Sequence, residues 1–306
     1  MIKFILRRLL ELIPVLLISI TIVFFMVRLA PGGPFTAEKS FTAEAIERLN
    51  EHYGLDKPIM VQYGTYLLNL LKGDLGPSFQ YPSRSVNDII KETFPVSLEL
   101  GVLAMLFALF IGLMAGITAS LKPNTLQDHV PMGLAMTGIC MPSFVLGPLL
   151  ILVFGLGLGW FNASGWEIPS DRVLPVITLG AAYAAYISRL TRGSMLEVLP
   201  SDYIRTARAK GLSETNVIFK HTLKNALLPV VSYLGPATAG ILTGSFVVET
   251  IFNIPGMGRM FVLAAFNRDY TLILGLVVFF SLLVVVFNAV VDILLGMLNP
   301  KLRMDS

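Results

Sequence analysis

Residue types that serve metal binding, nucleophilic catalysis or phosphate binding are few in this sequence, and they are scattered along it. His52, His129 and His221 fall in three separate predicted loops, so we expect no common metal site. The single cysteine, Cys140, lies in a long apolar segment, where we expect it to fill space. The phosphate-binding pattern GxxxxGK[ST] does not occur, and the nearest glycine pattern, at residues 255–261, lacks a third glycine and a strand-turn-helix context, so we interpret it as a turn. The sequence therefore predicts a non-enzymatic chain without an ATPase site of its own.

A basic segment at residues 201–229, SDYIRTARAKGLSETNVIFKHTLKNALLP, has residues suited to binding a partner rather than to catalysis. Ser201 or Asp202 can cap a short helix, YIRTARAK, which ends in basic residues and is followed by Gly211. Ser213 can then begin a second helix. Two capped helices rich in cations predict a docking surface for a soluble partner. The alternative is an amphipathic pair that rests on anionic lipid.

The composition places this segment in a membrane protein. Hydrophobic residues make up 55% of the chain and charged residues 14%, and the mean hydropathy is +0.73. Soluble domains carry about 25% charged residues, so a soluble globule is excluded. The net charge of +3 does not indicate nucleic-acid binding, because the Lys and Arg residues lie between apolar segments.

Six apolar runs are long enough to cross a bilayer as helices, which predicts an all-α polytopic membrane protein. The third run contains Pro142 and Pro148, so we expect it to be kinked or broken. The predicted spans are residues 9–29, 97–121, 132–160, 173–190, 227–248 and 271–298.

The distribution of Lys and Arg predicts the orientation of these spans. Lys3, Arg7 and Arg8 precede the first run, which is longer than the core of a cleaved secretory signal, so we interpret it as a retained anchor. Most of the Lys and Arg in short loops then lie on the N-terminal side, which predicts cytoplasmic N- and C-termini. We divide the chain into an N-terminal anchor helix (1–30), an external helical loop (31–95), a five-helix core (96–300) with a cytoplasmic loop (191–226), and a cytoplasmic tail (301–306).

The external loop contains two predicted helices. Thr42 can cap the first, which ends at Gly54, and Pro58 can begin the second, which Gly73 closes. Aromatic residues supply the apolar bulk for a small lid. The alternative is a loop on the membrane surface whose aromatic residues anchor it at the interface.

Small and polar residues distinguish two of the spans. In the second span, small residues recur every four positions and predict close helix packing: Ala104, Ala108, Gly112, Gly116 and Ser120. In the fifth span, a mixture of hydroxyl-bearing and small residues makes a polar-lined pathway a candidate: Ser232, Gly235, Thr238, Thr243 and Ser245. The ionisable residues of the spans lie near the span ends, as at Arg28, Glu99, Arg189 and Asp292. If the protein moves a solute uphill, the energy must therefore come from another subunit.

The motif TARAKGL followed by HTLKNALLP resembles the cytoplasmic loop of permease subunits in bacterial ATP-binding-cassette (ABC) importers, and in particular of the peptide-importer branch. The general pattern of that loop is Glu-Ala-Ala, three residues, Gly, nine residues and Ile-x-Leu-Pro. Here Arg205 stands in place of the Glu, and Leu228-Pro229 comes later than the general spacing, so no role of that Glu is transferred. The N-terminal segment, GLDKPIMVQY, KGDLGPSF and ETIFNIPGMGRMFVLAAFNRDY resemble the oligopeptide permease subunit that is usually encoded first of its pair.

The resemblance implies a type I ABC importer permease fold and an alternating-access mechanism in a bacterial inner membrane. It implies a second homologous permease subunit, two cytoplasmic ATPase subunits that hydrolyse ATP with Mg, and an external solute-binding protein that delivers peptide. This chain would bind no cofactor. The residues implied to couple it to the ATPases are Tyr203, Ile204, Arg205, Thr206, Ala207, Arg208, Ala209, Lys210 and Gly211. Import of dipeptides, nickel chelates or glutathione remains open within the same family, and an ion-coupled secondary carrier is the alternative from another class.

Overall fold

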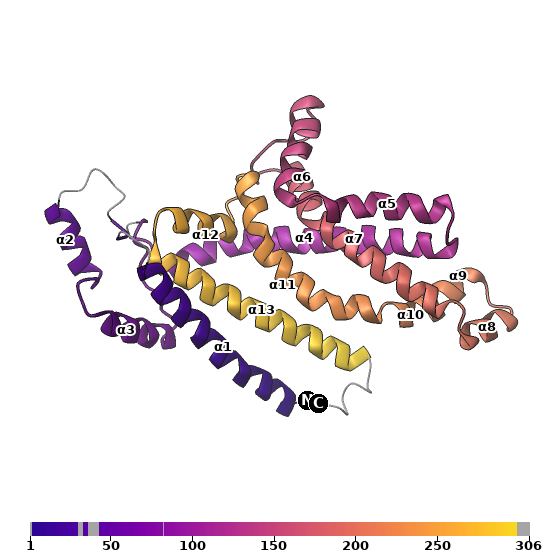
Figure 1. Cartoon of the computed structure of the whole chain (residues 1–306), viewed down its shortest axis with the longest axis horizontal. Helices are drawn as coiled ribbons and strands as arrows, with labels where there is room; N and C mark the ends of the chain where they lie inside the picture. Colours follow the sequence, from indigo (N-terminus) through magenta and orange to yellow (C-terminus); the bar gives the residue numbers. More distant parts are fainter. Residues whose placement is uncertain (1, 30–32, 36–42, 82, 299–306) are drawn as a thin grey trace. The chain divides into compact units, whose positions relative to one another are not determined.

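The computed structural model describes residues 2–29, 33–35, 43–81 and 83–298 of the 306-residue chain, and it divides them into two compact units. The first unit contains Met1–Ser97 and Pro255–Val285, and the second contains Leu98–Ile254 and Val286–Ser306. Helices account for all the long elements of the described residues (Figure 1), and Pro77 and Ser85 form an isolated β-bridge.

The first unit contains α1 (Ile2–Leu29), α2 (Ala43–His52), α3 (Ile59–Leu71), the beginning of α4 (Val86–Leu121), α12 (Met257–Phe266) and the larger part of α13 (Tyr270–Leu298). The two helices predicted for the external loop are confirmed as α2 and α3. Gly54 and Gly73 follow them with φ angles of +66° and +77°, and Pro58 is the N-cap of α3. Thr42, the predicted cap of α2, lies outside the described residues.

Apolar contacts and one buried carboxylate hold the first unit together. Ile20 and Phe24 of α1 pack against Tyr66 of α3 and Leu274 of α13. Asp269, which is fully buried, accepts hydrogen bonds from the backbone of Phe79, Gln80 and Leu272 and from the Ser78 and Thr271 hydroxyls. This carboxylate therefore ties the loop before α4 to the first turn of α13.

The second unit contains α5 (Leu126–Cys140), α6 (Ser143–Leu150), the π-helix η1 (Ile151–Gly157), the short η2 (Pro169–Arg172), α7 (Val173–Val198), the α8–α10 loop and α11 (Leu228–Ile251). The break predicted in the third span is confirmed, because the pair of helices 126–140 and 143–157 is bent by 109°. Pro142 explains the break, since it holds Met141 in an extended conformation that ends α5.

Close packing of the second span is also confirmed, and its partner is α7. A Cβ atom on Gly112 would lie 2.7 Å from the Ala184 carbonyl oxygen, and one on Gly116 would lie 2.5 Å from Thr191 Cβ. Ala108 is fully buried in the same contact. Glycine is therefore required at both positions for the two helices to approach.

Helix bounds differ from the predicted spans in several places. α4 begins at Val86 rather than at residue 97, and α7 continues to Val198 rather than ending at residue 190. The prediction of a turn at residues 255–261 was wrong, because α12 begins at Met257. Gly256 has the extended conformation of an N-cap, and the apolar residues after it continue as a helix. Within the described residues, four helices are long and apolar enough to cross a membrane, or five with the bent pair, so the count of six stays a prediction.

Candidate functional site

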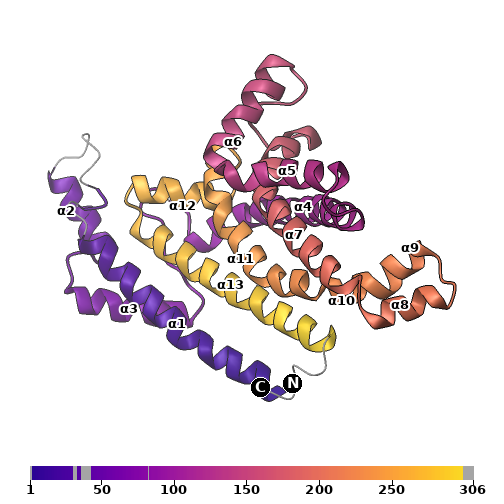
Figure 2. The same ribbon diagram turned by 45° about the vertical axis from the view of Figure 1, so that its right-hand side comes forward.

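The predicted docking loop forms a compact helical excursion at one end of α7. It contains α8 (Asp202–Ala209), α9 (Glu214–Asn216), the π-helix η3 (Val217–Thr222) and α10 (Leu223–Ala226). Within their unit, α8 and α9 lie beyond the ends of α7 and α10 in both views (Figures 1 and 2). The predicted pair of helices is thus confirmed, and the second of them includes a π-helical turn that the sequence did not indicate.

The start of α8 differs from the expected side-chain cap. Ser201 occupies the N-cap position with an extended conformation, but its hydroxyl donates to the Val198 carbonyl at 2.6 Å and accepts no helix N–H. The hydroxyl therefore fastens α8 to the last turn of α7. Arg205 lies 3.7 Å from Asp202 across one turn of α8, and both side chains are largely exposed.

The end of α8 follows the expected glycine chemistry. Gly211 has a φ of +77°, its N–H donates to the Arg208 carbonyl at 2.9 Å, and the Leu212 N–H donates to the Ala207 carbonyl at 3.4 Å. These two bonds form a Schellman motif, which satisfies carbonyls that the helix end would leave open. A Cβ on Gly211 would meet no atom within 4 Å, so the glycine is needed for its backbone conformation and not for space.

Only one face of α8 is buried. Ile204 and Ala207, three residues apart, pack against Val217 of η3 and Val198 of α7. Around this small core, Arg208 makes two hydrogen bonds to Glu214, at 2.8 and 3.3 Å, and the Asn225 amide donates to the Tyr203 hydroxyl at 2.8 Å. The remaining predicted coupling residues are exposed, and we call this set the docking surface: Tyr203, Arg205, Thr206, Arg208, Ala209, Lys210 and Gly211.

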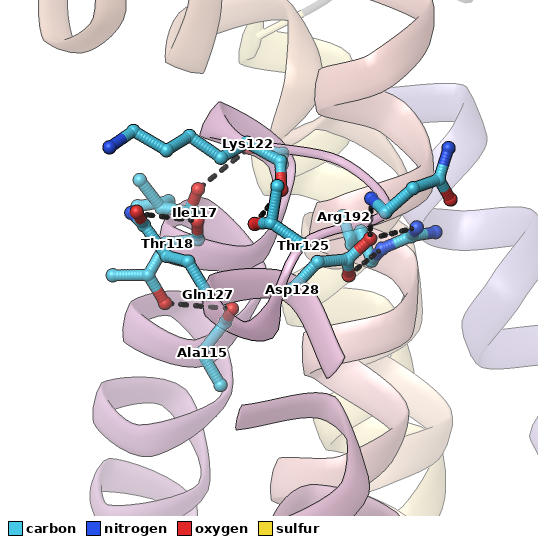
Figure 3. A network of polar contacts seen from close by, with 10 residues as sticks. Ala115, Ile117, Thr118, Lys122, Thr125, Gln127, Asp128 and Arg192 are labelled. Atoms are coloured by element: carbon cyan, nitrogen blue, oxygen red, sulfur yellow. Dashed lines mark hydrogen bonds and ion pairs between the residues drawn. The ribbon is translucent and has the colours of Figure 1, made fainter. Parts of the chain in front are cut away.

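Sequence reasoning missed an ion pair close to this loop (Figure 3). Arg192 of α7 donates through Nε and Nη2 to the two carboxylate oxygens of Asp128 in α5, each at 2.6 Å. The Asn124 N–H also donates to Asp128 at 2.9 Å, and the Asp128 side chain is only 2% exposed. The pair therefore fastens the first turn of α5 to α7, shortly before α7 leads into α8. Opposite charges near the ends of consecutive spans were the available signal.

A second ion pair lies toward the other ends of α4 and α7. Arg172 donates to Glu99 at 2.6 Å and lies over the ring of Trp166, whose indole N–H also donates to Glu99 at 3.1 Å. Glu99 therefore has specific partners in this unit.

The candidate pathway residues of α11 do not share one face. Ser232 and Thr243 are exposed, Thr238 is half-buried, and Gly235 and Ser245 are buried within the unit. The four hydroxyls bond backbone carbonyls one turn earlier in α11, at 2.7–3.0 Å. The pathway role stays a prediction, and the exposed Ser232 and Thr243 are its strongest candidates. No three His, Cys, Asp or Glu side chains of the described ranges gather as a metal ion would require.

Protein families and individual known proteins match this chain over nearly its whole length. Residues 108–304 match the family described as Binding-protein-dependent transport system inner membrane component. Residues 1–101 match a second family, which is described as the N-terminal part of such a membrane component. The chain is 52% identical over 305 residues to the oligopeptide transport system permease protein OppB of Escherichia coli K12, which covers 99% of this chain and 100% of that protein.

Other relatives and structures agree with this match. The Haemophilus influenzae OppB is 50% identical with the same coverage, and the dipeptide transport system permease protein DppB of Bacillus subtilis is 44% identical over 100% of this chain and 99% of its own. An inward-facing structure of the MetNI methionine ABC transporter has a TM-score of 0.59 at 16% identity, covering 69% of this chain and 96% of that chain. An amino acid ABC transporter structure has a TM-score of 0.54 at 16% identity, over 69% of this chain and 94% of its own. These structures share the permease fold.

Proposed function

This chain belongs to the family of binding-protein-dependent transport system inner membrane components, and we propose that it is the transmembrane permease subunit of an ATP-driven oligopeptide importer. The observation that carries the proposal is the identity of 50–52%, from end to end, with permease proteins named for oligopeptide transport. The apolar helices long enough to cross a membrane agree with it.

The importer would consist of this chain, a second homologous permease, two cytoplasmic ABC ATPases and an external solute-binding protein. The ATPases, and not this chain, would bind ATP together with Mg and would hydrolyse the ATP. The N- and C-termini would lie in the cytoplasm, and the docking surface would then lie on the side of the ATPases. Peptide would pass between this chain and the second permease by alternating access.

In this proposal the docking surface receives the motion of an ATPase. Arg205 and Lys210 supply exposed positive charge there, while Ile204 and Ala207 hold α8 on the rest of the loop. Because Ser201 and the Schellman bonds fix both ends of α8, a push on the docking surface displaces the whole loop rather than one frayed helix.

The dipeptide importers are the second candidate, because the Bacillus subtilis dipeptide permease is 44% identical over the full chain. Importers of nickel chelates or glutathione would use the same permease design, with the ligand selected largely by the solute-binding protein. A binding measurement on that exported partner with peptides of different lengths separates these candidates.

Uptake of a labelled oligopeptide into proteoliposomes tests the proposal. We expect uptake only with the assembled complex, the binding protein and ATP, and we expect the double charge reversal Arg205→Glu with Lys210→Glu to abolish most of it. Lys224→Glu is the matched control, since Lys224 is exposed on α10 outside the docking surface. Uptake by this chain alone in an ion gradient would refute the proposal in favour of an ion-coupled secondary carrier. Normal coupling in the double reversal would refute the role of the docking surface.

A further inference from the structure

The first compact unit contains a cavity that the proposed transport mechanism does not use. Its volume is about 330 Å³, and it lies among the end of α1, the turn between α2 and α3, one face of α3 and the loop that begins at Leu75. Its ionisable lining includes two cations, Arg28 and Lys57, and the exposed carboxylate of Glu51 at the rim.

Arg28 is held in this cavity as a positive charge without a carboxylate partner in the described part of the chain. Its Nε donates to the Gln62 side-chain oxygen at 3.1 Å, and its guanidinium carbon lies 3.5 Å from the centre of the Phe24 ring. The Gln62 amide in turn donates to the Leu55 and Lys57 carbonyls at 3.1 and 2.8 Å. Arg28 Nη1 also donates to the Phe24 carbonyl at 3.3 Å. The guanidinium is thus fixed in position, while three of its five N–H groups have no acceptor among the described residues and are left for a ligand.

Tyr66 lines the same cavity, and its hydroxyl is the one buried side-chain polar atom of the described residues without a hydrogen-bond partner. The residue is only 9% exposed, and its ring packs in the apolar cluster between α1 and α3. Burial raises the pKa of the Tyr66 phenol, so the group remains a neutral donor. Buried polar groups are nearly always paired, which makes this hydroxyl an indication of a ligand.

The helices on either side of the cavity carry exposed apolar surfaces. α3 packs Tyr63, Leu67 and Leu70 into the apolar cluster with α1, and the adjoining face of the helix exposes large apolar side chains: Met60, Val61, Leu68 and Leu71. α1 likewise exposes Ile18, Ile22, Met26 and Leu29 along its C-terminal half, which also carries Arg28. A helix with a polar side toward the cavity and exposed apolar side chains elsewhere, beside the last turn of a helix that the sequence predicts to be a membrane anchor, fits the interfacial region of a bilayer.

We propose that this cavity binds the phosphodiester of an anionic phospholipid in the leaflet that the Leu29 end of α1 reaches. Arg28 would pair with the phosphate oxygens, the Tyr66 hydroxyl would donate to the same group, and Lys57 would add positive charge at the entrance. The acyl chains would lie along the exposed apolar faces of α1 and α3. Guanidinium groups suit phosphate because their fork of N–H donors matches its oxygens, and interfacial cations attract anionic lipid. A soluble anion would use the same donors but would gain nothing from these apolar faces.

Thermal unfolding of the chain purified with its partner subunits in a neutral detergent tests the proposal. Dioctanoyl phosphatidylglycerol is titrated as the lipid probe, and glycerol 3-phosphate as a soluble phosphate probe. We expect the lipid, and not the soluble phosphate, to raise the unfolding midpoint in a saturable way. Tyr66→Phe should weaken this response roughly tenfold in lipid concentration, because it removes a hydrogen bond to a charged acceptor. Arg28→Gln should weaken it further.

The controls separate binding from folding. Tyr66→Phe removes a hydroxyl that has no hydrogen-bond partner among the described residues, so without lipid the variant should unfold at the wild-type midpoint or above it. Tyr63→Phe is the matched control, because that hydroxyl is already paired with Thr21 at 2.6 Å and lies outside the cavity lining, so its lipid response should be unchanged. An unchanged lipid response in Tyr66→Phe overturns the proposal even if Arg28→Gln fails to fold. Equal stabilisation by glycerol 3-phosphate overturns the assignment to lipid.

Discussion

Replacing Gly211 with alanine tests whether the end of α8 must be closed for coupling. Gly211 has a φ of +77°, a region that costs a residue with a Cβ about 1–2 kcal/mol. Because a Cβ there would meet no atom within 4 Å, the whole cost is conformational. We therefore expect Gly211→Ala to raise the ratio of open to closed α8 ends roughly 5- to 30-fold. Gly211→Asn should have a smaller effect, since Asn adopts this conformation more readily.

Hydrogen exchange measures this ratio directly. The Leu212 N–H donates to the Ala207 carbonyl only when the α8 end is closed, so its exchange in the assembled complex should accelerate by the same factor. Gly193→Ala is the matched control, because Gly193 lies within α7, has no positive φ and would also meet no atom within 4 Å. There alanine should stabilise the helix by up to about 1 kcal/mol. Exchange in α7 should therefore slow or stay constant.

Two results would contradict the reasoning. If the Leu212 amide exchanges equally in Gly211→Ala and the unchanged protein, the positive φ is not a constraint on the α8 end. If exchange accelerates as expected while ATPase activity remains fully stimulated by peptide and binding protein, then closure of α8 is not required for coupling. Gly211→Pro is a less informative variant, because it also removes the N–H that bonds the Arg208 carbonyl.

Three further predictions concern contacts within one or the other of the two units. Gly116→Val should lower the thermal unfolding midpoint, because its Cβ would lie 2.5 Å from Thr191 Cβ and overpacking costs roughly 1–3 kcal/mol or more. Gly133→Ala is the control and should leave the midpoint unchanged, because a Cβ on Gly133 would meet no atom within 4 Å. Asp128→Asn should lower both the unfolding midpoint and the transport rate. The double variant Asp128→Asn with Arg192→Gln should lose less stability than the sum of the losses in the two single variants. Strictly additive losses would show that the two side chains are not coupled. Asp269→Ala should expose the loop before α4 to limited proteolysis, because three backbone N–H groups lose their acceptor at about 1–3 kcal/mol each, and unchanged resistance to protease would contradict this.

Elements whose signals are local could be predicted from the sequence. α3 begins after Pro58 and is closed at Gly73, and α8 is closed at Gly211, because a fixed proline φ and a left-handed glycine act within one turn. The break before Pro142 has the same local cause. The small-residue stripe of α4 also predicted close packing correctly, since a backbone can approach closely only where side chains are small.

Features that depend on distant residues could not be predicted. The Asp128–Arg192 pair joins residues 64 positions apart, and the sequence indicates only that both lie near span ends. The Ser201 hydroxyl can either accept a backbone N–H of α8 as a helix cap or donate to a backbone carbonyl of α7. In the structure it donates to the α7 carbonyl. Burial of Ser245 beside the exposed Thr243 depends on which helices surround α11, so a pattern of hydroxyls along one segment does not identify the face that lines a pathway.

The contacts of α7 explain how a small surface helix could act on the membrane spans. α7 meets α4 at Gly112 and Gly116 so closely that neither helix can rotate against the other without a clash, and it is fastened to α5 by Arg192. At its end, the Val198 carbonyl accepts the Ser201 hydroxyl that begins α8. Since interlocked helices shift as a body, a displacement of the docking surface would move α7 together with α4 and α5, rather than being absorbed by bending at the loop. Loosening α7 at Asp128 should therefore reduce coupling even though Asp128 is no part of the docking surface.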